Sequence, residues 1–342
     1  MEVKMEIVKQ TSLAIGFTLL CTASANAFTA CQVTDVGGID DASFNQTAWH
    51  GVENAIANRG IDGRFLESQS ETDYAANLNA LMDGSCDIIV TVGFLMGEAT
   101  ANAATANPNQ KFSIVDFAYD PTIPNVLGQI FATDEAAFLA GYLAAGMTET
   151  GTIGTFGGLN IPPVTAFMNG LVYGVDYYNE QHGTSVSVLG WNPSSQEGLF
   201  TNNFDSLDDG RAFAQNLYDE GADIVMPVAG PVGLGSAALA AELGSDSLKI
   251  IGVDADLVAT DPERADVYLT SVLKRMDSTV EAVINAAMDG SFEGGLTVGT
   301  LANNGVGIAP YHNFESAVPP ELKAEIDAVR AGIIDGSISV GP

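Results

Sequence analysis

Three residues able to bind a small polar molecule lie within one short segment near the amino end of this chain. Residues 33–46 contain Asp35, Phe44 and Asn45, which supply a carboxylate, an aromatic face and a carboxamide. Apolar residues precede Asp35 and two glycines follow it closely, a pattern typical of a strand that turns into a helix. We therefore expect these side chains at the carboxyl end of a first strand, where open α/β sheets bind small ligands. Together they suit a flat polar molecule that carries hydroxyl groups.

The helix after this turn has a recognisable start. Ser43 and Gln46 have the S-x-x-Q spacing of a capping box, which predicts a helix beginning near Phe44. Asp40 and Asp41 precede it, and carboxylates there favour the positive end of a helix. We interpret the two aspartates as residues of the turn and the helix start.

Other candidate binding residues lie later in the chain. Asp116 and Asp254 each end an apolar run, and each could accept a hydrogen bond from a ligand hydroxyl. The alternative for both, as for Asp35, is a helix N-cap, which is common for an aspartate after a strand. Asp256 could take the binding role of Asp254. Gly230 opens a Gly-Pro-Val-Gly-Leu-Gly segment that matches no phosphate-binding motif, so it reads as a tight turn where a ligand could approach the backbone.

Apolar strand-like runs alternate with helical patterns along the chain, which predicts an α/β fold with parallel sheets covered on both faces. Strands are expected near residues 32–36, 87–92, 112–116, 125–130, 152–156, 185–190, 223–228, 249–253 and 266–272. Helices are expected near 44–58, 73–83, 96–106, from 134 onward, and near 164–180, 208–219, 233–243, 275–288 and 319–334. No Pro-, Gly- or Ser-rich linker separates the two similar halves, so we expect two lobes that share short crossings and enclose a cleft.

The first 27 residues have the order of a secretory signal peptide. Two lysines precede an apolar stretch over 13–20, and residues 25–27 form an A-x-A cleavage pattern. We expect cleavage near Ala27 and a periplasmic protein. A lipid anchor is less favoured, because Leu20 before Cys21 is too large for a lipobox.

The two remaining cysteines suggest a disulfide. Cys31 and Cys86 each open an apolar strand, and the starts of two neighbouring parallel strands lie at disulfide distance. Exported proteins rarely keep exposed thiols. We expect a Cys31–Cys86 bond, with two buried free thiols as the alternative.

The charge of the chain argues against polyanionic partners. The formal net charge is −31, with only 12 lysines and arginines. Such a surface repels phosphate backbones and anionic lipid, so we expect neither nucleic-acid nor peripheral membrane binding. We interpret it as a solvated acidic coat suited to salty surroundings.

Seven motifs spread over nearly all residues after 27 carry a family resemblance: Thr34–Gln46, Val92–Phe94, Ile114–Asp116, Asp134–Ala145, Val228–Gly230, Ile251–Asp256 and Thr270–Lys274. Through these motifs the chain resembles the basic membrane protein (BMP) family of ABC-transporter substrate-binding proteins, which are purine nucleoside receptor-like. The resemblance implies a type I periplasmic binding protein fold, with two Rossmann-like lobes and three crossover segments. We expect an N-terminal lobe of residues 28–132 plus 271–300 and a C-terminal lobe of 133–270 plus 301–342.

Members of this family capture a nucleoside between the lobes and deliver it to ABC permease subunits in a membrane. The resemblance therefore implies a nucleoside ligand, with purine favoured, and a permease partner. We expect a monomer with no cofactor. Many members are lipid-anchored, whereas this leader has the pattern of a plain secretory signal.

The resemblance also implies roles for single residues. In the family a purine stacks between two aromatic rings, and Phe44 matches the first. Phe204 best matches the second, with Phe200 as a rival. Asn45 lies beside Phe44 and, with Gly230, completes this part of the expected site.

The polar contacts follow in the same way. Asp35 and Asp116 resemble residues that contact the base or the sugar, and Asp254 resembles one that binds ribose hydroxyls. Lys274 lies where the family places a lysine on the ribose, although a solvated surface lysine is the alternative. Its neighbour Arg275 is expected to face solvent. Three carboxylates against one lysine disfavour a phosphate dianion, so we expect nucleosides rather than nucleotides.

No enzyme motif competes strongly with this interpretation. A metal-dependent nucleoside hydrolase has an N-terminal D-x-D-x-x-x-D-D cluster, but here Val33 stands at the first aspartate and the Asp40–Asp41 pair is shifted. We therefore expect no catalytic residues and no metal site. A binding protein that signals to a receptor is the other alternative, because it too needs only ligand-driven closure.

Overall fold

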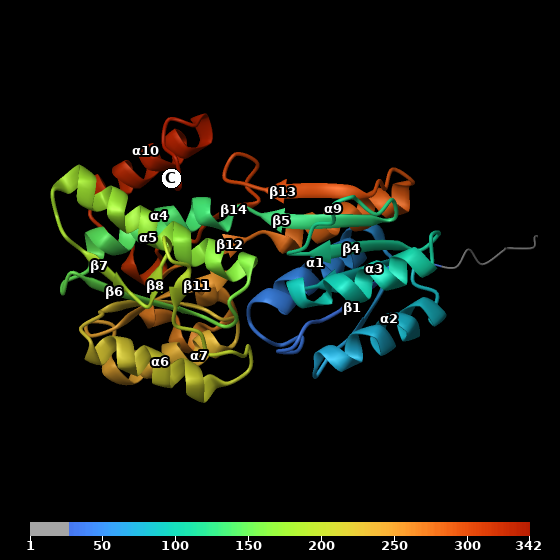
Figure 1. Ribbon diagram of the computed structural model, residues 1–342, viewed down its shortest axis with the longest axis horizontal. Coiled ribbons are helices and arrows are strands. Elements are labelled where there is room, and N and C mark those ends of the chain that lie inside the picture. Colours follow the sequence, from blue (N-terminus) through green and yellow to red (C-terminus); the bar gives the residue numbers. More distant parts are fainter. Residues whose placement is uncertain (1–26) are drawn as a thin grey trace, which may run out of the picture.

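The computed structural model describes residues 27–342, which form two six-stranded sheets flanked by helices (Figure 1). The expected signal peptide, except for Ala27, lies outside the described residues. The first sheet has the order β13-β5-β4-β3-β1-β2 and is entirely parallel. Its strands are β1 (Thr29–Val33), β2 (Asp62–Leu66), β3 (Ile88–Val92), β4 (Lys111–Val115), β5 (Val126–Phe131) and β13 (Gly295–Gly299). Its helices are α1 (Phe44–Arg59), α2 (Tyr74–Asp83), α3 (Gly97–Ala106) and α9 (Met276–Asp289).

The second sheet repeats this plan in the order β14-β12-β11-β10-β6-β7. Its strands are β6 (Thr152–Gly157), β7 (Ser187–Leu189), β10 (Ile224–Val228), β11 (Lys249–Asp254), β12 (Tyr268–Lys274) and β14 (Val306–Ile308). Its helices are α4 (Thr133–Met147), α5 (Pro162–His182), α6 (Leu207–Asp219), α7 (Val232–Leu243), α8 (Leu257–Thr260) and α10 (Pro320–Asp335). A small hairpin, β8 (Trp191–Asn192) with β9 (Glu197–Gly198), and four 3-10 turns complete the described chain. Each strand of one six-stranded sheet thus has a counterpart in the other, and within these two sheets only β14 is antiparallel to its neighbour.

We call each sheet with its helices a lobe. The chain crosses between the lobes three times, after β5, after β12 and after β13, as Figure 1 shows. The expected boundary at 270/271 falls inside β12, whose residues pair with the second sheet up to Lys274. This pairing favours a boundary four residues later.

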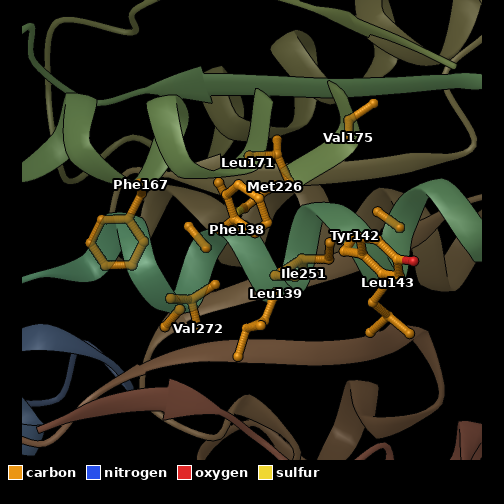
Figure 2. Close-up of a cluster of buried hydrophobic side chains, with 14 of the residues drawn as sticks. Phe138, Leu139, Tyr142, Leu143, Phe167, Leu171, Val175, Met226, Ile251 and Val272 are labelled. Carbon is orange, nitrogen blue, oxygen red and sulfur yellow. The ribbon is translucent and has the colours of Figure 1, made fainter. Parts of the chain in front are cut away.

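The second lobe contains the larger apolar core. Figure 2 shows α4 and α5 next to each other, with Phe138 and Leu171 between the two helices and Leu139 on the side of α4 that faces a strand of the sheet. Small residues allow this close packing: a Cβ added at Gly141 or Gly174 would overlap the backbone of the facing helix. Phe167 lies at the end of this core nearest the other lobe.

The sequence prediction missed three strands of the two six-stranded sheets, as well as the small β8–β9 hairpin, and each of the three has a physical reason. β2 is an edge strand of Asp62-Gly-Arg-Phe-Leu66 with no fully buried residue, so it lacks an apolar run. β13 and β14 are also edge strands and carry glycines. The first strand also lies earlier than expected, over residues 29–33 in place of 32–36.

Cys31 in β1 and Cys86 before β3 form a disulfide, with their Cα atoms 6.0 Å apart. β1 and β3 are parallel neighbours, which brings the two positions together. Among the helices of residues 27–342, none is both long and apolar enough to cross a membrane.

Candidate functional site

A cavity of about 580 Å³, including its open mouth, lies between the carboxyl ends of the two sheets. The first lobe contributes Asp35, Val36, Asp41, Phe44, Asn45, Gly93, Phe94 and Asp116. The second contributes Ile161, Pro163, Val164, Phe167, Phe204, Val228, Ala229, Gly230, Pro231, Val253, Asp254 and Lys274. Part of the lining comes from the loops after β1 and β3 in the first sheet and after β6 and β10 in the second. In each sheet these two strands are neighbours, and the order in which successive strands are added reverses between them. This is where open α/β sheets bind ligands. All eight ligand-binding candidates from the sequence line this one cavity.

Helix α1 begins at Phe44 as predicted, but the predicted capping box is wrong. The Ser43 side chain makes no capping hydrogen bond. Asp41 takes its place: Oδ2 accepts the Asn45 N–H at 2.8 Å, and Oδ1 accepts the N–H groups of Ser43 and Gln46 at 3.0 and 3.1 Å. A carboxylate suits this position because it meets both the unpaired N–H groups and the positive end of the helix.

Asp35 follows β1 and is held by a network in the first lobe. Its Oδ1 accepts the Val36 N–H at 2.7 Å and the Tyr74 hydroxyl, while Asn45 Oδ1 accepts the Asp35 N–H at 3.1 Å. Burial raises the pKa of Asp35 to about 6, against the lowering effect of the Tyr74 and Val36 hydrogen bonds. A glycine at position 93 makes room for the Asp35 carboxylate, because Gly93 has φ +121° and a Cβ on it would overlap Asp35 Oδ2. Asp35 lines the cavity with Oδ1 held by these hydrogen bonds and Oδ2 next to Gly93.

Lys274 ends β12 and joins the two lobes. Its Nζ lies 2.7 Å from Asp116 Oδ2 in the first lobe and 3.4 Å from Asp254 Oδ1 in the second. The lysine is 2% exposed, so the sequence alternative of a solvated surface lysine is wrong. Burial lowers the pKa of Lys274, but the charges of Asp116 and Asp254 outweigh burial and the net shift is upward. Lys274 therefore stays charged.

Three aromatic rings surround the Lys274 ammonium. Its Nζ lies 4.9 Å from the ring centre of Phe44, 5.2 Å from that of Phe167 and 5.8 Å from that of Phe131. These distances are within the range of cation–π attraction. The ammonium is thus held by aromatic faces as well as carboxylates.

The aspartates after the strands do not cap helices. Asp256, and not Asp254, caps α8 by accepting the Val258 N–H, and it also lies 2.8 Å from His312 Nε2. Asp256 is absent from the lining of the cavity. Asp116 and Asp254 are both buried. Asp254 Oδ1 makes no hydrogen bond of normal geometry within residues 27–342, and its ionic partner is the Lys274 ammonium at 3.4 Å. Burial raises the pKa of Asp116.

The aromatic candidates of the second lobe are separated by the structure. Phe204 lines the cavity, next to Gly158, where a Cβ would overlap its ring. Phe200 instead packs edge-on against Trp191, with ring centres 5.8 Å apart, and does not reach the cavity. Gly230 has φ +55°, a backbone conformation that glycine adopts readily, and a Cβ there would meet no atom within 4 Å.

Sequence reasoning missed several lining residues. The sequence pattern assigns Asp41 to the turn, whereas the structure also places it in the cavity, where burial raises its pKa to about 6. Phe94 follows Gly93 and ends the Val92–Phe94 motif, so its aromatic side chain was an available signal. The sequence around Phe167 carries no such signal, because a phenylalanine on an amphipathic helix is ordinarily interpreted as part of the apolar core.

The donor set suits an uncharged polar ligand. Asp35, Asp41, Asp116 and Asp254 supply acceptors, and Lys274 is the one basic side chain among the described residues that line the cavity. Within residues 27–342, no group of three or more His, Cys, Asp or Glu side chains is arranged to hold a metal ion.

Comparison with known proteins agrees with this geometry. The family model of the PnrA-like ABC transporter substrate-binding proteins, Bmp, matches residues 28–341. The ABC transporter nucleoside-binding protein BmpA of Lactococcus lactis subsp. cremoris is 31% identical over 328 residues, which cover 91% of this chain and 88% of that protein. Basic membrane protein A of Borreliella burgdorferi is 32% identical over 309 residues, covering 89% and 85%.

A solved structure shows the same architecture. An ABC transporter solute-binding protein from Aeropyrum pernix K1 matches with a TM-score of 0.82 and 27% identity, over 91% of this chain and 92% of that one. The expected fold class, an α/β periplasmic binding protein fold, is therefore confirmed. The chain belongs to the Bmp family of PnrA-like ABC transporter substrate-binding proteins.

Proposed function

We propose that this protein captures a nucleoside, with purine favoured, outside the cytoplasm and delivers it to the permease of an ABC importer. The observation that supports this most is the shared cavity. An aromatic face from each lobe, Phe44 and Phe204, accompanies buried aspartates from both lobes. Flat bases stack on aromatic rings, and carboxylates accept hydrogen bonds from sugar hydroxyls.

The charge of the cavity favours a nucleoside over a nucleotide. Lys274 is already paired with Asp116 and Asp254, so it has no free charge to offer a phosphate. Asp35 and Asp41 add further carboxylates to the same lining. A phosphate dianion placed there would meet uncompensated like charge in a poorly solvated site.

A binding screen tests the proposal. We expect adenosine, inosine or guanosine to raise the melting temperature, and free sugars and amino acids to leave it unchanged. Isothermal titration would then compare adenosine with AMP, and adenosine should bind more tightly. A preference for AMP, or stabilisation by amino acids alone, would contradict the proposal.

The alternatives give different outcomes in the same preparation. A nucleoside hydrolase would release free base from adenosine during prolonged incubation with a divalent metal ion, whereas a carrier returns the nucleoside unchanged. Uptake of labelled nucleoside in cells with and without the cognate permease separates delivery from sensing. We expect uptake to require both proteins.

A further inference from the structure

A neutral hydrogen bond joins the two lobes at a residue with no other assigned role. Ser43 Oγ in the first lobe donates to the backbone carbonyl of Val253 in the second, at 2.9 Å. The same hydroxyl lies 3.4 Å from Asp254 Oδ2. Ser43 is 3% exposed, so water does not compete freely for this contact.

The hydroxyl is available because another residue performs its usual task. A serine just before a helix ordinarily accepts a hydrogen bond from the first turn. Here Asp41 accepts the N–H groups of Asn45 and Gln46 instead. Asp41 also accepts the Ser43 N–H, which fixes the serine backbone and directs it toward the other lobe.

The contact lies next to a ligand-binding candidate. Val253 precedes Asp254, whose backbone has φ +69°, a conformation that few residues other than glycine adopt. A hydrogen bond to the Val253 carbonyl restrains the peptide that leads into this conformation. Asp254 Oδ1 then lies toward Lys274, 3.4 Å from its Nζ.

We propose that Ser43 is a positioning residue that latches the two lobes closed and sets the orientation of Asp254. This role does not depend on which ligand the cavity holds. It differs from the Lys274–Asp116 ion pair because it is uncharged and because it links the start of α1 to the end of β11.

The test compares Ser43→Ala with Ser236→Ala in the protein without ligand. Ser236 is a matched control: its buried hydroxyl donates to the Gly210 carbonyl at 2.8 Å, but both residues lie in the second lobe. We expect small-angle X-ray scattering to give a larger radius of gyration for Ser43→Ala than for wild type. Ser236→Ala should match wild type in radius, even where both variants lower the melting temperature.

A second variant keeps the test possible if Ser43→Ala fails to fold. Ser43 has φ −143° and ψ −106°, an unusual pair of angles that glycine tolerates, so Ser43→Gly should fold if Ser43→Ala does not. It too removes the hydroxyl and should open the lobes. A wild-type radius of gyration in a folded Ser43 variant would overturn the proposal.

Affinity gives an independent readout with adenosine as the probe. Loss of one neutral hydrogen bond corresponds to roughly a two- to tenfold weaker affinity, which we expect to arise from faster release. Failure of wild type to bind adenosine would count against the proposed function, whereas the scattering comparison would still decide the latch.

Discussion

Asp116 and Asp254 occupy equivalent places in the two lobes and share the same unusual backbone. Asp116 follows β4 and Asp254 ends its counterpart β11, with φ values of 65° and 69°. Left-handed backbone is costly for residues other than glycine and is concentrated at functional sites. Here it brings one carboxylate from each sheet to the same ammonium, that of Lys274.

Removal of that ammonium should destabilise the protein strongly. Lys274→Met leaves two buried carboxylates without a counter-charge, and breaking a buried ion pair in this way costs about 3–5 kcal/mol. We expect a large fall in the melting temperature, measured by circular dichroism. Lys323→Met is the control, because its partner Glu315 is exposed and such pairs contribute about 0–1 kcal/mol. Equal losses from both variants would contradict this account of Lys274.

Phe44→Ala should weaken nucleoside binding at least tenfold, because it removes one aromatic face of the cavity. The far-ultraviolet circular dichroism should remain unchanged, since Asp41 still caps α1. Phe292→Ala provides the comparison: this ring packs on the same apolar cluster of the first lobe but does not line the cavity. Unchanged affinity in Phe44→Ala would remove Phe44 from the binding site.

The two phenylalanines of the loop over residues 199–206 should behave differently. Phe204→Ala is expected to lower nucleoside affinity roughly fivefold to twentyfold, by loss of stacking and apolar contact. Phe200→Ala should mainly lower the melting temperature, because its ring packs on Trp191. Titration calorimetry on both variants decides the matter, and a greater loss of affinity in Phe200→Ala would reverse the assignment.

The pKa of Asp35 predicts a pH dependence with a defined sign. Its pKa is about 6 in the folded protein against 3.8 ordinarily, so the folded state holds the proton more tightly. The resulting destabilisation is present above pH 6 and is relieved as the pH falls toward 4. Asp35→Asn keeps the Oδ1 acceptor but cannot ionise. The melting temperature of Asp35→Asn should therefore exceed that of wild type by more at pH 7 than at pH 5. The change in this difference should correspond to roughly 1–3 kcal/mol of unfolding free energy. A difference that does not change with pH would contradict the shift.

Much of the fold could be predicted because apolar runs and their spacing report buried strands and helices directly. The fully buried strands β3, β10 and β11 lie where the sequence predicts them. Edge strands could not be found in this way, because β2 and β13 are stabilised by backbone pairing to a neighbour and not by burial of their own side chains.

The site could be predicted where polar residues follow apolar strands. Asp35, Asp116 and Asp254 carry that signal, and each lines the cavity. The role of Ser43 could not be predicted, since a capping box and an interlobe hydrogen bond require the same residue type at the same place. Which of the two forms depends on Asp41, two residues earlier, and on the approach of Val253 from a part of the chain 210 residues away.

The matching strand order of the two sheets makes the two lobes that line the cavity topologically similar. β5 and β12 are equivalent strands, yet one ends in Phe131 and the other in Lys274. A duplicated scaffold would by itself present two equivalent halves, which would bind an asymmetric solute equally well in two orientations. Of these two strand-end residues only Lys274 lines the cavity, so the one basic side chain of the described lining comes from the second lobe alone. This asymmetry gives an asymmetric solute a preferred direction in which to lie.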